Sequence, residues 1–103
     1  MAVLTITKDN FQKEVLESNV PVLLDFWATW CGPCRMIAPV VEEVEESANG
    51  AFKVGKVNVD DEPELAQSFR IAVIPTLVVV KDGKIANQTT GVQSKEAILS
   101  LLS

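Results

Sequence analysis

The sequence has no histidine and only two cysteines among its 103 residues. Because a closed zinc site takes about four cysteine or histidine ligands, one copy of the chain cannot supply such a site, and we expect no bound metal. Basic residues are also few: nine lysines and arginines stand singly against fourteen acidic residues, for a formal net charge of -5. Nucleic acids and anionic membranes bind clustered positive charge, so we expect neither as a partner.

Long apolar runs are missing as well, and none approaches the roughly 20 residues that span a bilayer. Residues 1–8 lack the positive region and apolar stretch of a secretory signal. We therefore expect a cytoplasmic protein. Hydrophobic residues make up 48% of the chain and aromatic residues only 6%, which fits one domain over residues 1–103 with a core of valine, isoleucine and leucine.

The two cysteines stand close together in Trp30-Cys31-Gly32-Pro33-Cys34. A disulfide that closes so small a loop restricts the unfolded chain little, and stabilises by roughly 2 kcal/mol against ~3 for a 15-residue loop. The pair would be a poor structural staple. Two such cysteines near a strand-to-helix junction are typical of reversible thiol–disulfide chemistry.

Strand and helix patterns alternate along the chain. Apolar strand patterns cover residues 3–6, 20–28, 52–59, 76–80 and 85–90, and helical spacing follows 11–16, the cysteines to about 49–50, 63–69 and the stretch after Ser94. The order βαβαβαββα predicts an α/β fold: a central mixed sheet, parallel where helices cross over and antiparallel at the final hairpin, with helices on both faces. Residues 20–28 are apolar on both faces, which favours a place in mid-sheet.

Several local signals refine this outline. Pro39 predicts a kink near residues 35–39, and the acidic residues 60–62 before Pro63 predict a capped helix start. Asp82-Gly83 is a strong hairpin turn. Ser94 is a suitable cap for the last helix.

Cys31 is expected beyond the carboxyl end of the strand 20–28, where sites form in such sheets. If a helix begins at residues 31–33, the Cys31 sulfur lies beside unpaired N–H groups at the positive end of the helix dipole, which favours the reactive thiolate. Cys34 follows one turn later and can close the ring. Gly32 allows close approach of a partner backbone, and Pro33 suits a first turn.

Asp25 is an anomaly, a carboxylate inside an otherwise apolar run. If it is buried, desolvation raises its pKa and makes it a candidate proton carrier for a nearby thiol; the alternative is that it points to solvent. Lys56 is either its partner from the next strand or a solvated charge. Trp30 suits either the core or an exposed partner-binding surface. Gly91 fits a turn that ends a strand, and spacing alone favours an ordinary trans Pro75.

Together, the segment from Phe26 to Cys34, Lys56-Val57-Asn58-Val59-Asp60 and Ile74-Pro75-Thr76 closely resemble the thioredoxin family, and the match runs essentially end to end. The resemblance implies the thioredoxin fold, and a cis form for Pro75. It implies that Cys31 is the attacking thiolate, Cys34 the resolving thiol, Asp25 a buried base acting on Cys34 and Lys56 its modulator. The residues implied to form an apolar docking face are Trp30, Gly32, Pro33, Ile74, Pro75, Gly91 and Val92.

The activity implied is protein-disulfide reduction by a monomer with no bound cofactor. The redox-active group is then the Cys31–Cys34 disulfide, a thioredoxin reductase restores the dithiol, and the substrates are disulfide-containing proteins. Two alternatives stay open: a disulfide oxidase or isomerase of the same fold, and a binding module whose cysteines do not matter. Arg35 stands where lysine is commoner, and Ala72-Val73 is less typical, which bears on partner preference.

Overall fold

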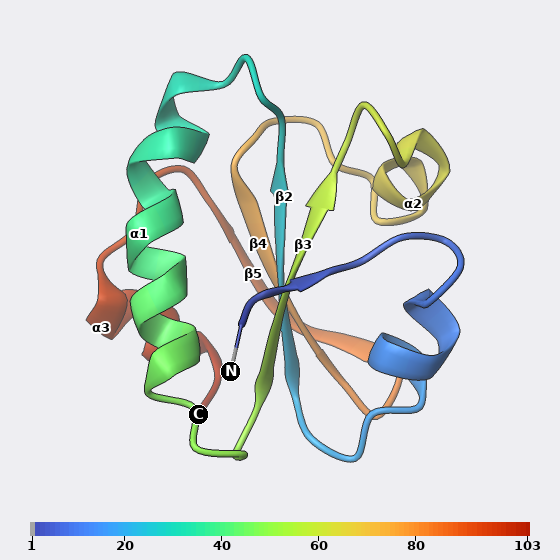
Figure 1. Ribbon diagram of the computed structural model, residues 1–103, viewed down its shortest axis with the longest axis vertical. Helices are drawn as coiled ribbons and strands as arrows, with labels where there is room; N and C mark the ends of the chain where they lie inside the picture. Colours follow the sequence, from blue (N-terminus) through green and yellow to red (C-terminus); the bar gives the residue numbers. More distant parts are fainter. Residues whose placement is uncertain (1) are drawn as a thin grey trace.

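Five strands form one mixed sheet with helices on both faces in the computed structural model, which describes residues 2–103 (Figure 1). The elements in chain order are β1 (Leu4–Thr5), the short π-helix η1 (Gln12–Leu16), β2 (Val22–Trp27), α1 (Gly32–Glu46), β3 (Lys53–Asn58), α2 (Pro63–Ser68), β4 (Thr76–Lys81), β5 (Lys84–Thr90) and α3 (Lys95–Leu101). The predicted alternation of elements and the α/β fold class are confirmed. The strands lie in the order β1-β3-β2-β4-β5, with β2 at the centre as predicted.

The core has two layers, one on each face of the sheet. Alternate residues of β2 point to opposite faces, so Leu23 packs in the layer with Ile37 of α1 and Ile98 of α3, whereas Leu24 and Phe26 pack in the other layer. Figure 1 shows α1 and α3 on one face and η1 and α2 on the other. This burial on both faces explains why the sequence of β2 is apolar at nearly every position.

The direction of β4 differs from the prediction. Strands β1, β3 and β2 run parallel, but β4 pairs antiparallel with β2 as well as with β5. The expectation that every helical crossover joins parallel strands is therefore wrong for α2. A six-residue helix is only about 9 Å long, whereas a six-residue strand spans about 20 Å, so α2 does not carry the chain back along the sheet. As a result β4 begins at the end of the sheet where β2 and β3 finish.

The ends of α1 and α2 also depart from the sequence signals. Helix α1 continues through Pro39 and ends at Glu46, before the predicted Asn49-Gly50, and both of these residues then adopt positive φ. At the start of α2 no side chain caps the helix. The Glu62 carboxylate instead accepts a hydrogen bond of 3.0 Å from the Lys8 backbone N–H, so the predicted acidic cap is wrong.

Two other local predictions are confirmed. Asp82 and Gly83 both have positive φ, at 51° and 75°, as a tight two-residue hairpin turn requires. The Ser94 hydroxyl accepts a hydrogen bond of 3.1 Å from the Ala97 N–H at the start of α3. None of the helices formed by residues 2–103 has the length and apolar character needed to cross a bilayer.

Candidate active site

The two cysteines form a disulfide at the start of α1. Cys31 is the N-cap residue of the helix, and its sulfur accepts a hydrogen bond of 3.2 Å from the Cys34 backbone N–H. The exposed fractions are only 4% for Cys31 and 3% for Cys34. A sulfur that receives an N–H at the positive end of a helix is one whose thiolate is stabilised, which is the environment that the sequence predicted.

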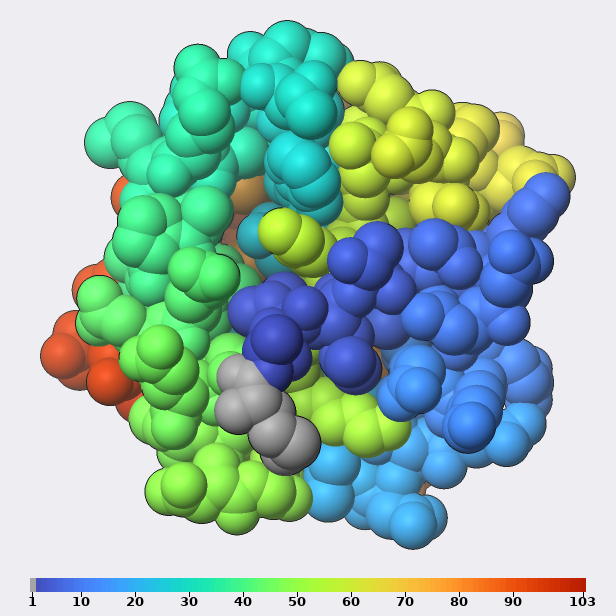
Figure 2. Space-filling view, viewed as in Figure 1, coloured from blue at the N-terminus to red at the C-terminus, as the bar shows by residue number. Residues whose placement is uncertain are grey.

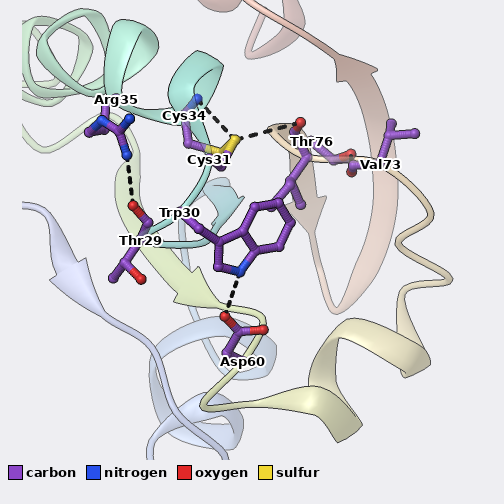
Figure 3. The surroundings of a disulfide bond; sticks show 9 residues. Thr29, Trp30, Cys31, Cys34, Arg35, Asp60, Val73 and Thr76 are labelled. Carbon is purple, nitrogen blue, oxygen red and sulfur yellow. Dashed lines mark hydrogen bonds between the residues drawn. A yellow bond between two sulfur atoms is a disulfide. The ribbon is translucent and has the colours of Figure 1, made fainter.

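The segment before β4 lies beside this disulfide (Figure 3). The Cys31 sulfur is 3.8 Å from the carbonyl oxygen of Ile74, 43 residues away in the sequence. The Ile74-Pro75 peptide bond is cis, so the preference for trans based on spacing is wrong and the form implied by the family resemblance is confirmed. The two isomers differ by only about 0.5–1 kcal/mol before proline, and local sequence does not resolve such a difference.

The segments around the disulfide carry several exposed apolar side chains. Trp30 is 68% exposed, and Val73, Val92 and Met36 are exposed too. The Trp30 indole is held in place because its Nε1 donates a hydrogen bond of 2.9 Å to the Asp60 carboxylate. Of the two positions that the sequence allowed for Trp30, the surface position is the one observed.

Gly91 follows the end of β5 and lies next to the Ile74-Pro75 segment. It has a φ of 82°, and its N–H donates a hydrogen bond of 2.9 Å to the Pro75 carbonyl. A positive φ of this size favours glycine, which agrees with the predicted turn. Together with Gly32 and Pro33 from α1, these residues complete the set for which the family resemblance implies a docking face: Trp30, Gly32, Pro33, Ile74, Pro75, Gly91 and Val92.

Asp25 is buried in the centre of the sheet, with an exposed fraction of 4%. Its Oδ1 has no hydrogen-bond partner among residues 2–103, so the alternative that it points to solvent is wrong. Desolvation by burial raises the pKa of Asp25 from 3.8 to about 7, against a smaller lowering by the positive charge of Lys56. The carboxyl group therefore changes protonation near neutral pH.

Lys56 lies opposite Asp25 on the neighbouring strand β3. It is exposed, and its Nζ lies 5.3 Å from the ring centroid of Trp27, within the range of a cation–π contact. The two groups share a cavity of about 120 Å³, lined also by Val3 and by Ala38, Val41 and Glu42 of α1. In Figure 2 it lies between the green residues of α1, the dark blue N-terminal residues and the yellow-green residues of β3.

This cavity places Asp25 beside α1, the helix that carries Cys34 in its first turn. Among the described residues, no hydrogen bond joins Asp25 to Cys34. Ala38 lines the cavity one helical turn after Cys34, and residues four apart lie on the same face of a helix. A volume of about 120 Å³ is room for a few water molecules at roughly 30 Å³ each.

Sequence reasoning assigned no role to Asp60, and it gave Arg35, Ala72 and Val73 only a bearing on partner preference. Asp60 fixes Trp30, and Arg35 donates a hydrogen bond of 2.7 Å to the Thr29 carbonyl. Ala72 and Val73 help to line a hollow of about 160 Å³ next to Trp30. The sequence held one signal for Asp60. This acidic residue follows β3, and the carboxyl ends of neighbouring strands meet at the same edge of the sheet, where sites form.

Comparison with known proteins agrees with this geometry. The family model for thioredoxin matches residues 2–103. The chain belongs to the thioredoxin family. It is 46% identical over 102 residues to the thioredoxin of Mycobacterium tuberculosis strain H37Rv, an alignment that covers 99% of this chain and 88% of that one. It is also 46% identical over 97 residues to thioredoxin 1 of Nostoc sp., covering 94% and 91% of the two chains.

A third relative joins two activities in one polypeptide. The bifunctional thioredoxin reductase/thioredoxin of Mycobacterium leprae is 44% identical over 98 residues, which are 95% of this chain and 21% of that protein. Members of the thioredoxin family are protein-disulfide oxidoreductases that act with a thioredoxin reductase. This chain is accordingly a protein-disulfide oxidoreductase, and the Cys31–Cys34 pair is its redox-active group.

Proposed function

We propose that the chain acts as a monomeric, cytoplasmic single-domain reductase of protein disulfides, residues 1–103, with a division of labour among the site residues. The observation that carries the proposal is the Cys31 sulfur at the N-cap of α1, hydrogen-bonded to the Cys34 N–H. The Cys31 thiolate attacks one sulfur of the partner's disulfide, and the other partner sulfur leaves as a thiolate. A mixed disulfide then joins Cys31 to the partner.

Cys34 ends this intermediate. Its proton passes to Asp25 through water in the shared cavity, and the Cys34 thiolate attacks the Cys31 sulfur. The second partner sulfur leaves as a thiolate, so the partner gains two electrons and the chain is left with its disulfide. A base that titrates near the working pH is suited to this transfer, and burial brings the pKa of Asp25 to about 7. Lys56 tunes that pKa from the neighbouring strand.

The docking face holds the partner during exchange. Its exposed apolar side chains give contact area, and the backbone at Ile74, beside the Cys31 sulfur, is an edge on which a partner strand can pair. After each cycle the dithiol is restored by a separate thioredoxin reductase. The Mycobacterium leprae relative, in which the two names stand together, supports this partner.

Substitution of each cysteine tests the assignment. Cys31→Ser is expected to abolish the acceleration by this chain of insulin disulfide reduction, with dithiothreitol or with a thioredoxin reductase and its reductant as the source of electrons. Cys34→Ser is expected to attack normally but to accumulate mixed disulfides, visible as a mass increase that reducing agent reverses. Full turnover in either variant would overturn the proposal. An equilibrium potential of the pair well above that of the glutathione pool would instead favour an oxidase or isomerase.

A further inference from the structure

The docking face carries no charge of its own, and the charged groups nearest to it differ in sign. Its seven residues are uncharged. Figure 3 shows Arg35 on one side of the disulfide, the 73–76 segment on the other and Asp60 beyond the Trp30 ring. The Asp60 carboxylate already accepts the Trp30 N–H, and the acidic residues Asp61 and Glu62 follow it directly. Among the residues drawn around the disulfide in Figure 3, the positive charge is that of Arg35.

The Arg35 side chain is exposed but held in place. Its Nη1 donates a hydrogen bond of 2.7 Å to the Thr29 carbonyl. Its Nη2 lies 4.0 Å from the position that a Cβ would take on Gly32, the residue after the attacking cysteine. The guanidinium thus lies along the segment that carries Trp30 and Cys31, within reach of any chain that seats a disulfide on Cys31.

The guanidinium has donors left for a partner. An arginine presents five N–H donors, and within residues 2–103 the bond to Thr29 is the one hydrogen bond of this side chain. No salt bridge occupies it in the same residues. The free donors form a planar group that matches a carboxylate in shape and charge. A lysine ammonium carries the same charge but lacks this planar shape.

We propose that Arg35 is a specificity-determining residue, which recognises an aspartate or glutamate flanking the disulfide of the partner protein. The inference rests on the proposed function and adds a substrate class to it. An apolar face supplies affinity for many partners, whereas a fixed charge at its rim discriminates among them and accelerates encounter. On a chain with a net charge of -5, a basic group beside the segment that carries the reacting cysteine favours acidic segments that the rest of the surface repels.

The test uses a set of short disulfide-containing peptides that differ at one position. Each peptide carries glutamate, glutamine or lysine at one position, chosen from the two residues before and the two residues after the attacked cysteine. We then measure kcat/KM for each peptide. At one flank we expect the wild-type chain to favour glutamate over glutamine by about three- to fivefold, a size typical of an exposed ion pair. The preference should shrink as salt is added.

Variants at position 35 separate charge from shape. Arg35→Gln is expected to lose the preference, Arg35→Lys to keep a smaller one and Arg35→Glu to favour the lysine peptide. Any general loss from breaking the bond to Thr29 affects all peptides and cancels in the ratio. Lys84→Gln, which removes one charge at the opposite end of the sheet, serves as the matched control and should leave the ratio unchanged.

Two results would overturn the inference: equal kcat/KM for the three peptides at every flank in the wild-type chain, or an undiminished glutamate preference in Arg35→Gln. Both leave the reductase assignment intact, because the glutamine peptide is still reduced. Failure to reduce any peptide, with insulin as a further substrate, would instead count against the proposed function.

Discussion

The Nε1 of Trp30 donates a hydrogen bond of 2.9 Å to a carboxylate oxygen of Asp60, a residue 30 positions further along the chain. This bond fixes an indole that is 68% exposed in one orientation beside the disulfide. An exposed tryptophan without such a tie samples several rotamers, and ordering it on binding costs free energy. The orientation of Trp30 therefore depends on a residue that follows β3.

Asp60→Ala is expected to weaken partner docking. A single hydrogen bond to a charged group is worth about 1.5–3 kcal/mol when fully formed, and less at an exposed site, so we expect KM for a protein disulfide to rise several-fold with a smaller change in kcat. The anisotropy of Trp30 fluorescence, measured in a Trp27→Phe background, should fall. Asp61→Ala is the control, and an equal effect of both substitutions would contradict the role of Asp60.

Asp25 is expected to make stability depend on pH. Its folded pKa of about 7 lies about three pH units above the value of 3.8, so between these values the folded chain binds a proton that the unfolded chain does not. The free energy of unfolding should then fall as pH rises from about 4 to 7, by at most roughly 4 kcal/mol at 1.36 per pH unit. Asp25→Asn should lack this fall and be the more stable form at pH 8.

Urea unfolding of both proteins at pH 5, 6, 7 and 8 measures this difference. Asp61→Asn, which removes an exposed carboxylate, serves as the control and should follow the wild-type curve. Parallel curves for Asp25→Asn and the wild type would mean that the folded pKa of Asp25 is not raised.

The same substitution is expected to separate the two steps of exchange. Asp25→Asn should slow the attack of Cys34 on the mixed disulfide by about 100-fold, the lower end of what a general base typically contributes, and change the first attack by Cys31 much less. Rapid-quench experiments with a chromogenic disulfide substrate measure separately how fast the mixed disulfide forms and how fast Cys34 resolves it. Equal slowing of both steps would count against Asp25 as the base for Cys34.

Lys56→Met provides a complementary measurement. The positive charge of Lys56 lowers the pKa of Asp25, so its removal should raise that pKa and shift the pH midpoint of the Cys34 step upward. Substitution of Lys95, which begins the remote helix α3, should leave the midpoint in place.

Gly55 of β3 is expected to tolerate no side chain. A Cβ at this position would lie 2.5 Å from Cγ1 of the buried Ile6 and 3.6 Å from Cδ2 of Leu24. Overpacking of this kind costs typically 1–3 kcal/mol, so Gly55→Ala should lower the free energy of unfolding by that amount. In an Ile6→Ala background, where the clashing side chain is gone, Gly55→Ala should lower the free energy of unfolding by less than it does in the wild type. Strict additivity of the two changes would contradict the clash.

Local signals in the sequence predicted much of this molecule. The apolar run of β2, the Asp82-Gly83 turn and the Ser94 cap each depend on residues within a few positions, and each is found as expected. The two cysteines are likewise predictable, because three positions place them on one helical turn.

The features that local sequence patterns do not show depend on contacts between distant segments. The antiparallel pairing of β4 with β2 follows from the shortness of α2 relative to a strand, which the pattern of apolar residues does not state. The hydrogen bond from Trp30 to Asp60 and the approach of Ile74 to Cys31 join residues 30 and 43 positions apart. No short-range pattern contains that information.

The two sulfurs lie on one helical turn, which is held in place by the central strand β2 before it and by the rest of α1 after it. Electron transfer thus needs only a local movement of side chains, and we expect both redox forms to share one backbone. A partner leaving after exchange is consequently released by rupture of its covalent link, without any large rearrangement to expel it. Affinity for the docked protein must then be modest, because nothing else in the cycle would weaken it.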